Sequence, residues 1–182
     1  MEIRPYFDGQ FLAVGAALCG GRAYAVLKDF CKSLLSLMGP VTDDQVYALM
    51  EQLLARPCEA LTVDTRLEGT RTDSSLRGSI TGISTNNFTP EALIRGFLEG
   101  MVEELYGMYR AMGLERRSLV GSGNGLRKNP ALQKAAVGRF GMPLRIPAHR
   151  EEAAFGAALY ALVAAGYCRD AADAQKRIRF SI

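Results

Sequence analysis

The stretch Ser118-Leu-Val-Gly-Ser-Gly-Asn-Gly-Leu-Arg-Lys-Asn-Pro130 decides what fold is expected of this chain. The apolar run 118–120 predicts a buried strand, and the glycines at 121, 123 and 125 predict a tight loop after it. Asn129 then stands at an N-cap and Pro130 at the first position of a helix. This order is typical of a nucleotide site, because glycines admit a ligand to the backbone and a helix start offers unpaired N–H groups.

The glycine loop does not name its ligand. A dinucleotide-binding fingerprint, Gly-x-Gly-x-x-Gly, would need glycine where the sequence has Leu126. A P-loop would end in Gly-Lys-Ser/Thr, and this loop does not. A tight strand-to-helix turn that binds nothing therefore stays open as the alternative.

Composition restricts the classes of protein to consider. The 182 residues suffice for one core of ordinary size, and a net charge of +3 is too small to predict binding to nucleic acid. The apolar run 153–165 is too short to span a membrane. We therefore expect no partner of either kind.

Cysteine and histidine usage argues against metal and hydrolase chemistry. The four cysteines form no Cys-x-x-Cys pair, and with the single histidine, His149, they give no zinc-binding spacing. Free thiols in a reducing cytoplasm are the expectation. His149 precedes an expected helix, where a solvated loop residue is favoured over a catalytic one.

Apolar patterning predicts one α/β domain with a mixed sheet. Asp8-Gly9 predicts a hairpin, and Thr42-Asp-Asp-Gln45 predicts a capping box. Strands are expected at 3–7, 11–18, 61–63, 77–83, 118–120 and 144–146; helices from 22, 42, 89, 129, 151 and 170; and a polar surface loop at 64–77. The helix from 22 carries one apolar face, formed by Val26, Leu27, Phe30, Leu34, Leu35 and Met38.

Four segments in a fixed order resemble a known family. They are Val14-Gly-Ala-Ala-Leu-Cys-Gly-Gly21, Leu67-Glu-Gly-Thr-Arg-Thr72 with Arg77-Gly78, Gly121-Ser-Gly123, and Glu151-Glu-Ala-Ala-Phe-Gly-Ala-Ala158. Each is weak alone, but their order and intervals resemble the C-terminal half of the FGGY carbohydrate kinases, over about residues 4–162.

The resemblance implies an actin-like, ribonuclease-H-like ATPase fold, in which two domains close over a cleft. Residues 1–182 would be the C-terminal, nucleotide-binding domain of a longer kinase chain, and the first hairpin of its sheet would lie upstream of Met1. ATP or ADP is the implied cofactor, with Mg²⁺ whose ligands lie mostly outside this chain. A sugar would be the substrate, bound largely by the N-terminal domain.

Motif by motif, the resemblance also implies cofactor-binding residues. Gly121, Ser122 and Gly123 would face the adenosine, and Asn129 would contact adenine. Gly20 and Gly21 would lie near the phosphates.

Two positions depart from the family pattern. Ala25 stands where relatives often carry a polar residue, and Thr70-Arg-Thr72 replaces a Glu-Arg-Thr-Pro pattern. Glu151 and Glu152 are expected to be structural acids at a helix start.

No catalytic residue is assigned in this chain, because the family's aspartate base belongs to the N-terminal half. Asp64, Glu68 and Asp73 are available carboxylates without a family role. This chain alone is therefore expected to be inactive. It is also expected to self-associate through an uncovered strand edge or face, unless the loop 64–75 covers the edge.

Two other functions stay open beside a sugar kinase. The chain could be a non-catalytic actin-like module that binds a nucleotide or a protein partner. It could also be a structural α/β domain whose glycine loop is empty.

Overall fold

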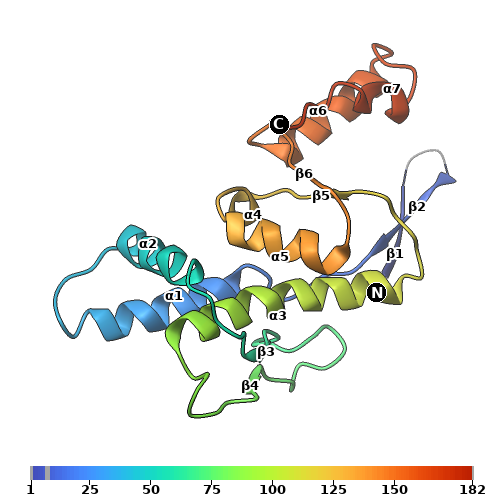
Figure 1. The fold of residues 1–182 in the computed structure, drawn as a ribbon. Coiled ribbons are helices and arrows are strands. Elements are labelled where there is room, and N and C mark those ends of the chain that lie inside the picture. Colours follow the sequence, from blue (N-terminus) through green and yellow to red (C-terminus); the bar gives the residue numbers. More distant parts are fainter. Residues whose placement is uncertain (1, 7–8, 182) are drawn as a thin grey trace.

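The structure is a computed structural model, and it describes residues 2–6 and 9–181. Its elements are β1 (Glu2–Pro5), β2 (Phe11–Val14), α1 (Arg22–Leu35), α2 (Asp43–Leu54), β3 (Thr62–Asp64), β4 (Ser79–Thr81), α3 (Pro90–Ala111), β5 (Leu119–Val120), α4 (Asn124–Arg127), α5 (Pro130–Phe140), β6 (Leu144–Arg145), α6 (Glu152–Ala164) and α7 (Ala171–Gln175). The long helix α3 lies at the centre, with α1 and α2 at one end, while α6 and α7 stand apart from the helices α1–α3 (Figure 1).

The strands confirm a mixed α/β class but do not join into one sheet. Within the described residues they form three two-stranded sheets. The pairs β1–β2 and β3–β4 are antiparallel, whereas β5–β6 is parallel. Each strand is only two to four residues long, so each ladder ends after a few pairs. The expected hairpin between β1 and β2 is confirmed, although Asp8 of its turn lies outside the described residues.

The predicted helix starts are confirmed. In the capping box, the N–H of Gln45 donates to Thr42 Oγ1 at 3.3 Å, and the N–H of Thr42 donates to Gln45 Oε1 at 2.8 Å. Thr89 caps α3, with Pro90 at the first helical position. Asn129 caps α5 by accepting from the N–H of Leu132 at 3.0 Å. These bonds satisfy N–H groups that a helix start leaves without partners.

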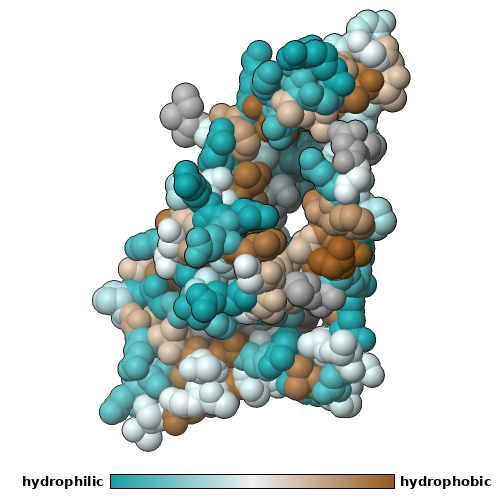
Figure 2. Space-filling model, turned by 90° about the vertical axis from the view of Figure 1, so that its right-hand side faces the viewer, coloured by the Kyte–Doolittle hydropathy of each residue, from teal (hydrophilic) through white to brown (hydrophobic). Residues whose placement is uncertain are grey.

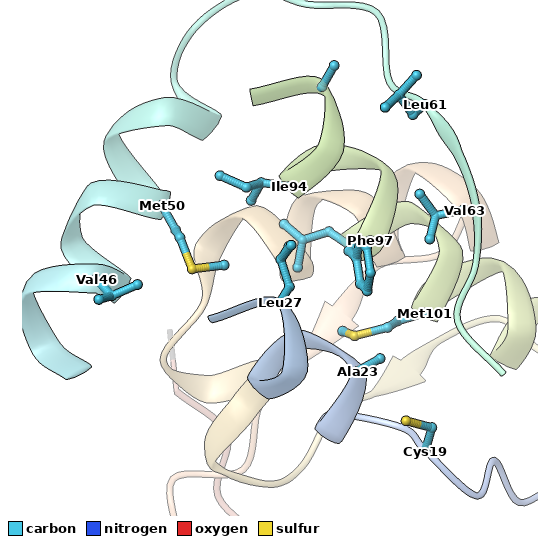
Figure 3. Close-up of a cluster of buried hydrophobic side chains, with 12 residues drawn as sticks. Cys19, Ala23, Leu27, Val46, Met50, Leu61, Val63, Ile94, Phe97 and Met101 are labelled. Atoms are coloured by element: carbon cyan, nitrogen blue, oxygen red, sulfur yellow. The ribbon is translucent and has the colours of Figure 1, made fainter. Parts of the chain in front are cut away.

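The main core lies where α1, α2, β3 and α3 meet. Buried side chains from all four elements converge there in Figure 3, with Ile94, Phe97 and Met101 of α3 in the middle. Helix α3 approaches β3 closely because Gly96 and Gly100 face it. A Cβ on Gly96 would overlap the carbonyl oxygen of Leu61, just before the strand, and a Cβ on Gly100 would overlap that of Val63 within it. The buried residues of α3, which include Ile94, Phe97 and Met101, therefore form the centre of this core.

Helix α1 carries the predicted apolar face, but most of that face is exposed. Leu27 is 2% exposed, but Phe30 is 53% and Met38, just beyond the helix, is 92% exposed. The residues of α1 that pack into the core with Leu27 include the small Ala23. A helical period shows that a face is apolar; it does not show whether another element covers that face.

A second, smaller core joins α6 and α7. Its buried members are Leu159, Cys168 and Ala174, with Phe155 and Ile178 packed against them. All four cysteines of the chain are free thiols.

Candidate functional site

The glycine loop begins as β5 ends, and its first glycine is required by packing. Gly121 is buried, and its N–H donates to the carbonyl of Arg145 at 3.0 Å, which continues the pairing of β5 with β6. A Cβ at this position would overlap the side chain of Leu126 and lie 3.0 Å from Leu144 Cδ1. Gly121 therefore lets the loop turn directly over the sheet.

The next two residues present backbone to solvent. Ser122 and Gly123 are both exposed, and Gly123 has a φ of +89°, which favours glycine. No atom lies within 4 Å of the position that a Cβ on Gly123 would occupy. A ligand can thus approach the backbone here without displacing side chains.

One expectation for this region is wrong. Gly125 does not belong to the loop, because the one-turn helix α4 starts at Asn124, before the helix that Asn129 caps. The N–H of Arg127 donates to the carbonyl of Gly123 at 3.0 Å and closes that turn. The predicted loop is therefore shorter, and α4 separates it from Asn129.

The two glycines before α1 are also open. Gly20 has a φ of +46°, and Gly21 is the N-cap of α1 without a side-chain cap bond. Neither has an atom within 4 Å of its would-be Cβ. The first turn of α1 contains no acidic residue of its own, and the nearby Glu68 carboxylate is paired with Arg22 at 2.9 Å.

Asn129 connects the start of α5 to the first turn of α1. Its side chain hydrogen-bonds with the phenol of Tyr24, which also stacks on Tyr47 with ring centroids 6.1 Å apart. Burial raises the pKa of Tyr24 to about 12, so the phenol is neutral at physiological pH. The structure thus brings Asn129 next to the helix that follows Gly20 and Gly21.

Sequence reasoning missed Arg127, which connects α4, directly after the glycine loop, to the segment between β6 and α6. Its guanidinium donates to the carbonyl of Pro147 at 2.7 Å and to that of His149 at 2.9 Å, and it pairs with the Glu152 carboxylate. Glu152 in turn accepts from the N–H of Gly123 at 3.4 Å. The hydrogen bond from its own backbone N–H, followed by those from Arg127 and from the N–H of Gly123, holds the pKa of Glu152 below its usual range. The only hint in the sequence is an arginine shortly after the loop and an acid at a later helix start.

The other predicted carboxylates are engaged elsewhere. Asp64 forms a 2.6 Å ion pair with Arg66, whose hydrogen bond lowers the pKa of Asp64. Glu68 pairs with Arg22 at 2.9 Å, and Asp73 accepts from Ser75 within its own loop. None of these contacts marks a general base.

His149 is more enclosed than expected. Its ring stacks on Phe155 with centroids 3.6 Å apart, and its Nε2 accepts from the N–H of Arg179 at 3.3 Å. His149 lies in the loop before α6, as predicted, but it is half-buried rather than fully solvated, because α6 and the C-terminal segment contact it.

Two cavities lie away from Gly20, Gly21 and the glycine loop 121–123. One, of about 710 Å³, lies between β3, α3 and α5, and another, of about 610 Å³, lies beside α5 and β6. Among the described residues no cluster of three or more His, Cys, Asp or Glu side chains could hold a metal ion. In the same part of the chain, no helix is long and apolar enough to cross a membrane.

Comparison with known proteins shows the family to which the chain belongs. A family model for the C-terminal domain of the FGGY family of carbohydrate kinases matches residues 4–165. The chain belongs to the FGGY family of carbohydrate kinases, and it corresponds to their C-terminal domain. Its fold is accordingly the actin-like ATPase fold.

Curated relatives specify the resemblance further. The chain is 30% identical to a sedoheptulokinase from Mus musculus over 163 residues and 28% identical to one from Homo sapiens over 165 residues. Each match covers 87% of this chain but 34% of the relative, so the chain spans about a third of these proteins.

Solved structures support the fold. A xylulose kinase from Lactobacillus acidophilus superposes with a TM-score of 0.69 at 17% identity, over 87% of this chain and 32% of that protein. A xylulose kinase from Rhodospirillum rubrum gives a TM-score of 0.69 at 20% identity, over 89% and 32%.

Proposed function

We propose that this chain supplies the adenosine and phosphate pocket of an ATP-dependent sugar kinase. The match to the family's C-terminal domain over residues 4–165 carries the proposal. The open backbone at Gly20, Gly21 and Gly123 supports it, since such positions suit a nucleotide held by main-chain contacts.

In this proposal each candidate residue has a limited role. Gly121, Ser122 and Gly123 face the adenosine, and Asn129 contacts the adenine. Gly20 and Gly21, before the uncapped start of α1, lie near the phosphates. ATP supplies the phosphoryl group when it is bound, and this chain holds and orients the nucleotide.

The substrate proposal is a ketose, with sedoheptulose as the first candidate. It rests on the two sedoheptulokinases among the relatives and on Gly121-Ser-Gly123 in the loop. The base that takes the proton from the sugar hydroxyl, and most sugar contacts, are proposed to come from an N-terminal domain. Mg²⁺ is part of the proposal for the whole enzyme, and we assign it no ligand here. The four free thiols suit a reducing cytoplasm, where we place the enzyme.

Calorimetry with ADP tests the nucleotide role. We expect weak, saturable binding to the 182-residue chain and no phosphorylation of sedoheptulose or xylulose in a coupled assay. Absence of ADP binding to folded chain at millimolar concentration would contradict the proposal. Sugar-dependent ADP formation by pure chain would instead place a base among its own carboxylates. A non-catalytic actin-like module is the second candidate, and it predicts ADP binding without sugar phosphorylation even in the full-length protein.

A further inference from the structure

We propose that Arg127 and Glu152 are positioning residues that make the glycine loop selective for the uncharged nucleoside end of a nucleotide. This inference rests on the proposed nucleotide-binding function. It concerns residues outside the glycine motif, from α4 and α6, that meet behind the loop.

The first step is the enclosure of the pair. The side chains of Arg127 and Glu152 are 21% and 23% exposed, whereas most ion pairs of the described residues involve a more exposed partner. Arg127 also donates to the carbonyls of Pro147 and His149, in the connection between β6 and α6. A planar guanidinium with three fixed acceptors loses most of its rotational freedom. The pair therefore anchors α4, and the loop that precedes it, to the start of α6.

The second step is the charge at the loop. Glu152 accepts from the N–H of Gly123, so a carboxylate of the chain itself occupies the amide that a phosphate would use. Arg127 is neutralised by the same carboxylate and offers no free positive charge. A phosphate placed here would meet a like charge at short range, which is unfavourable.

The third step concerns the groups of the loop that a ligand can still reach. Ser122 and the outer side of Gly123 are exposed and uncharged. A ribose or base can hydrogen-bond to such groups without replacing Glu152. The loop thus selects the nucleoside, and the phosphates must extend away from it.

Binding of inorganic pyrophosphate and of ADP distinguishes a loop that contacts the nucleoside from a loop that contacts phosphate. The Gly123 amide is followed by two-dimensional NMR in the wild type, in Glu152→Gln and in the neighbouring control Glu151→Gln, whose side chain makes no cap bond. In the wild type and the control, ADP should shift the Gly123 amide and pyrophosphate should not. In Glu152→Gln, pyrophosphate should shift the Gly123 amide, because the negative charge beside it is removed and Arg127 is no longer neutralised. ADP binding should weaken about tenfold, since a neutral amide oxygen accepts from Gly123 and Arg127 more weakly than a carboxylate does. Arg127→Lys keeps the positive charge but loses the planar guanidinium that contacts three acceptors at once. Its ADP affinity should therefore lie between those of the wild type and Glu152→Gln.

Other results would contradict either the inference or the proposed function. Pyrophosphate shifting Gly123 in the wild type, or Glu152→Gln matching the wild type with both ligands, would overturn the inference and leave the proposed function standing. A wild type that binds no ADP would remove the proposed function. The inference would then be judged by pyrophosphate alone, which must reach Gly123 only in Glu152→Gln. Unfolding temperatures within a few degrees of each other establish that the variants are folded.

Discussion

Asn129 caps α5 and also interacts with Tyr24 of α1, and substitutions can separate its structural role from ligand binding. Its oxygen caps α5, and its side chain also bonds Tyr24 of α1. Asn129→Ala should lose about 1 kcal/mol of unfolding free energy through the cap and should bind ADP more weakly. Asn129→Asp keeps the cap acceptor, so it should retain stability while ADP binding falls.

Denaturant unfolding and calorimetry check both effects, with exposed Asn124→Ala as the control. Equal ADP binding by Asn129→Asp and the wild type would show that the amide does not contact the ligand.

Asp43 makes stability depend on acid pH. Hydrogen bonds from Lys28 and then Lys32 lower the pKa of Asp43 to about 2, from an ordinary value of 3.8. Because the folded-state pKa is depressed, this contribution is fully present above about pH 4 and is lost as the pH falls towards 2.

Thermal unfolding between pH 2 and 6 measures the effect. Asp43→Asn should lower the unfolding temperature at pH 6, and its unfolding temperature should fall less than that of the wild type below pH 4. Asp44→Asn should show the same fall below pH 4 as the wild type. Asp44 is the matched control because it lies in the same helical turn, and none of the ion pairs found among the described residues includes it. An unchanged profile for Asp43→Asn would contradict the prediction.

At the scale of elements, the glycines of α3 determine how closely this helix packs on β3. A Cβ at Gly100 would overlap the Val63 carbonyl oxygen and lie 3.0 Å from Thr65 Cγ2. Gly100→Ala should therefore cost about 1–3 kcal/mol, as overpacking does.

Gly107, on the same helix, has no atom within 4 Å of a would-be Cβ. Gly107→Ala should stabilise by about 0.5–1 kcal/mol, because alanine favours a helix interior. Urea unfolding of both variants checks the pair of predictions. Equal effects of the two substitutions would show that the contact with β3 does not decide stability.

At the scale of the whole molecule, uncovered apolar surface predicts self-association. The outer face of α1 exposes Val26, Phe30 and Leu34, and Ile3 and Phe11 are exposed on the β1–β2 hairpin. Apolar residues also reach the surface on the side shown in Figure 2. The loop 64–75 reaches β1 through the 2.8 Å ion pair between Arg71 and Glu2, but each ladder still has only two strands in the described chain.

Sedimentation equilibrium tests this prediction. The wild type should form dimers or larger species as its concentration rises, since exposed apolar faces and strand edges favour association. Phe30→Glu combined with Leu34→Glu should shift the distribution towards monomer, whereas Leu105→Glu on α3 should not. A wild type that stays monomeric at high concentration would contradict the prediction.

The sequence by itself determined the features that depend on neighbours along the chain. Thr42, Thr89 and Asn129 start helices because each caps an N–H three residues ahead. The turn at the glycine loop also depends on residues next to one another in the sequence. The order of the motifs that indicated the family can likewise be read along the chain.

Only the tertiary structure decided which surfaces meet. The apolar period of α1 was visible, but its exposure depends on where α2 and α3 pack. The contact of Arg127 with Glu152 joins residues 25 positions apart, and the three separate ladders depend on strand pairing across the chain. Such contacts depend on the relative placement of whole elements, and no local pattern of residues contains that placement.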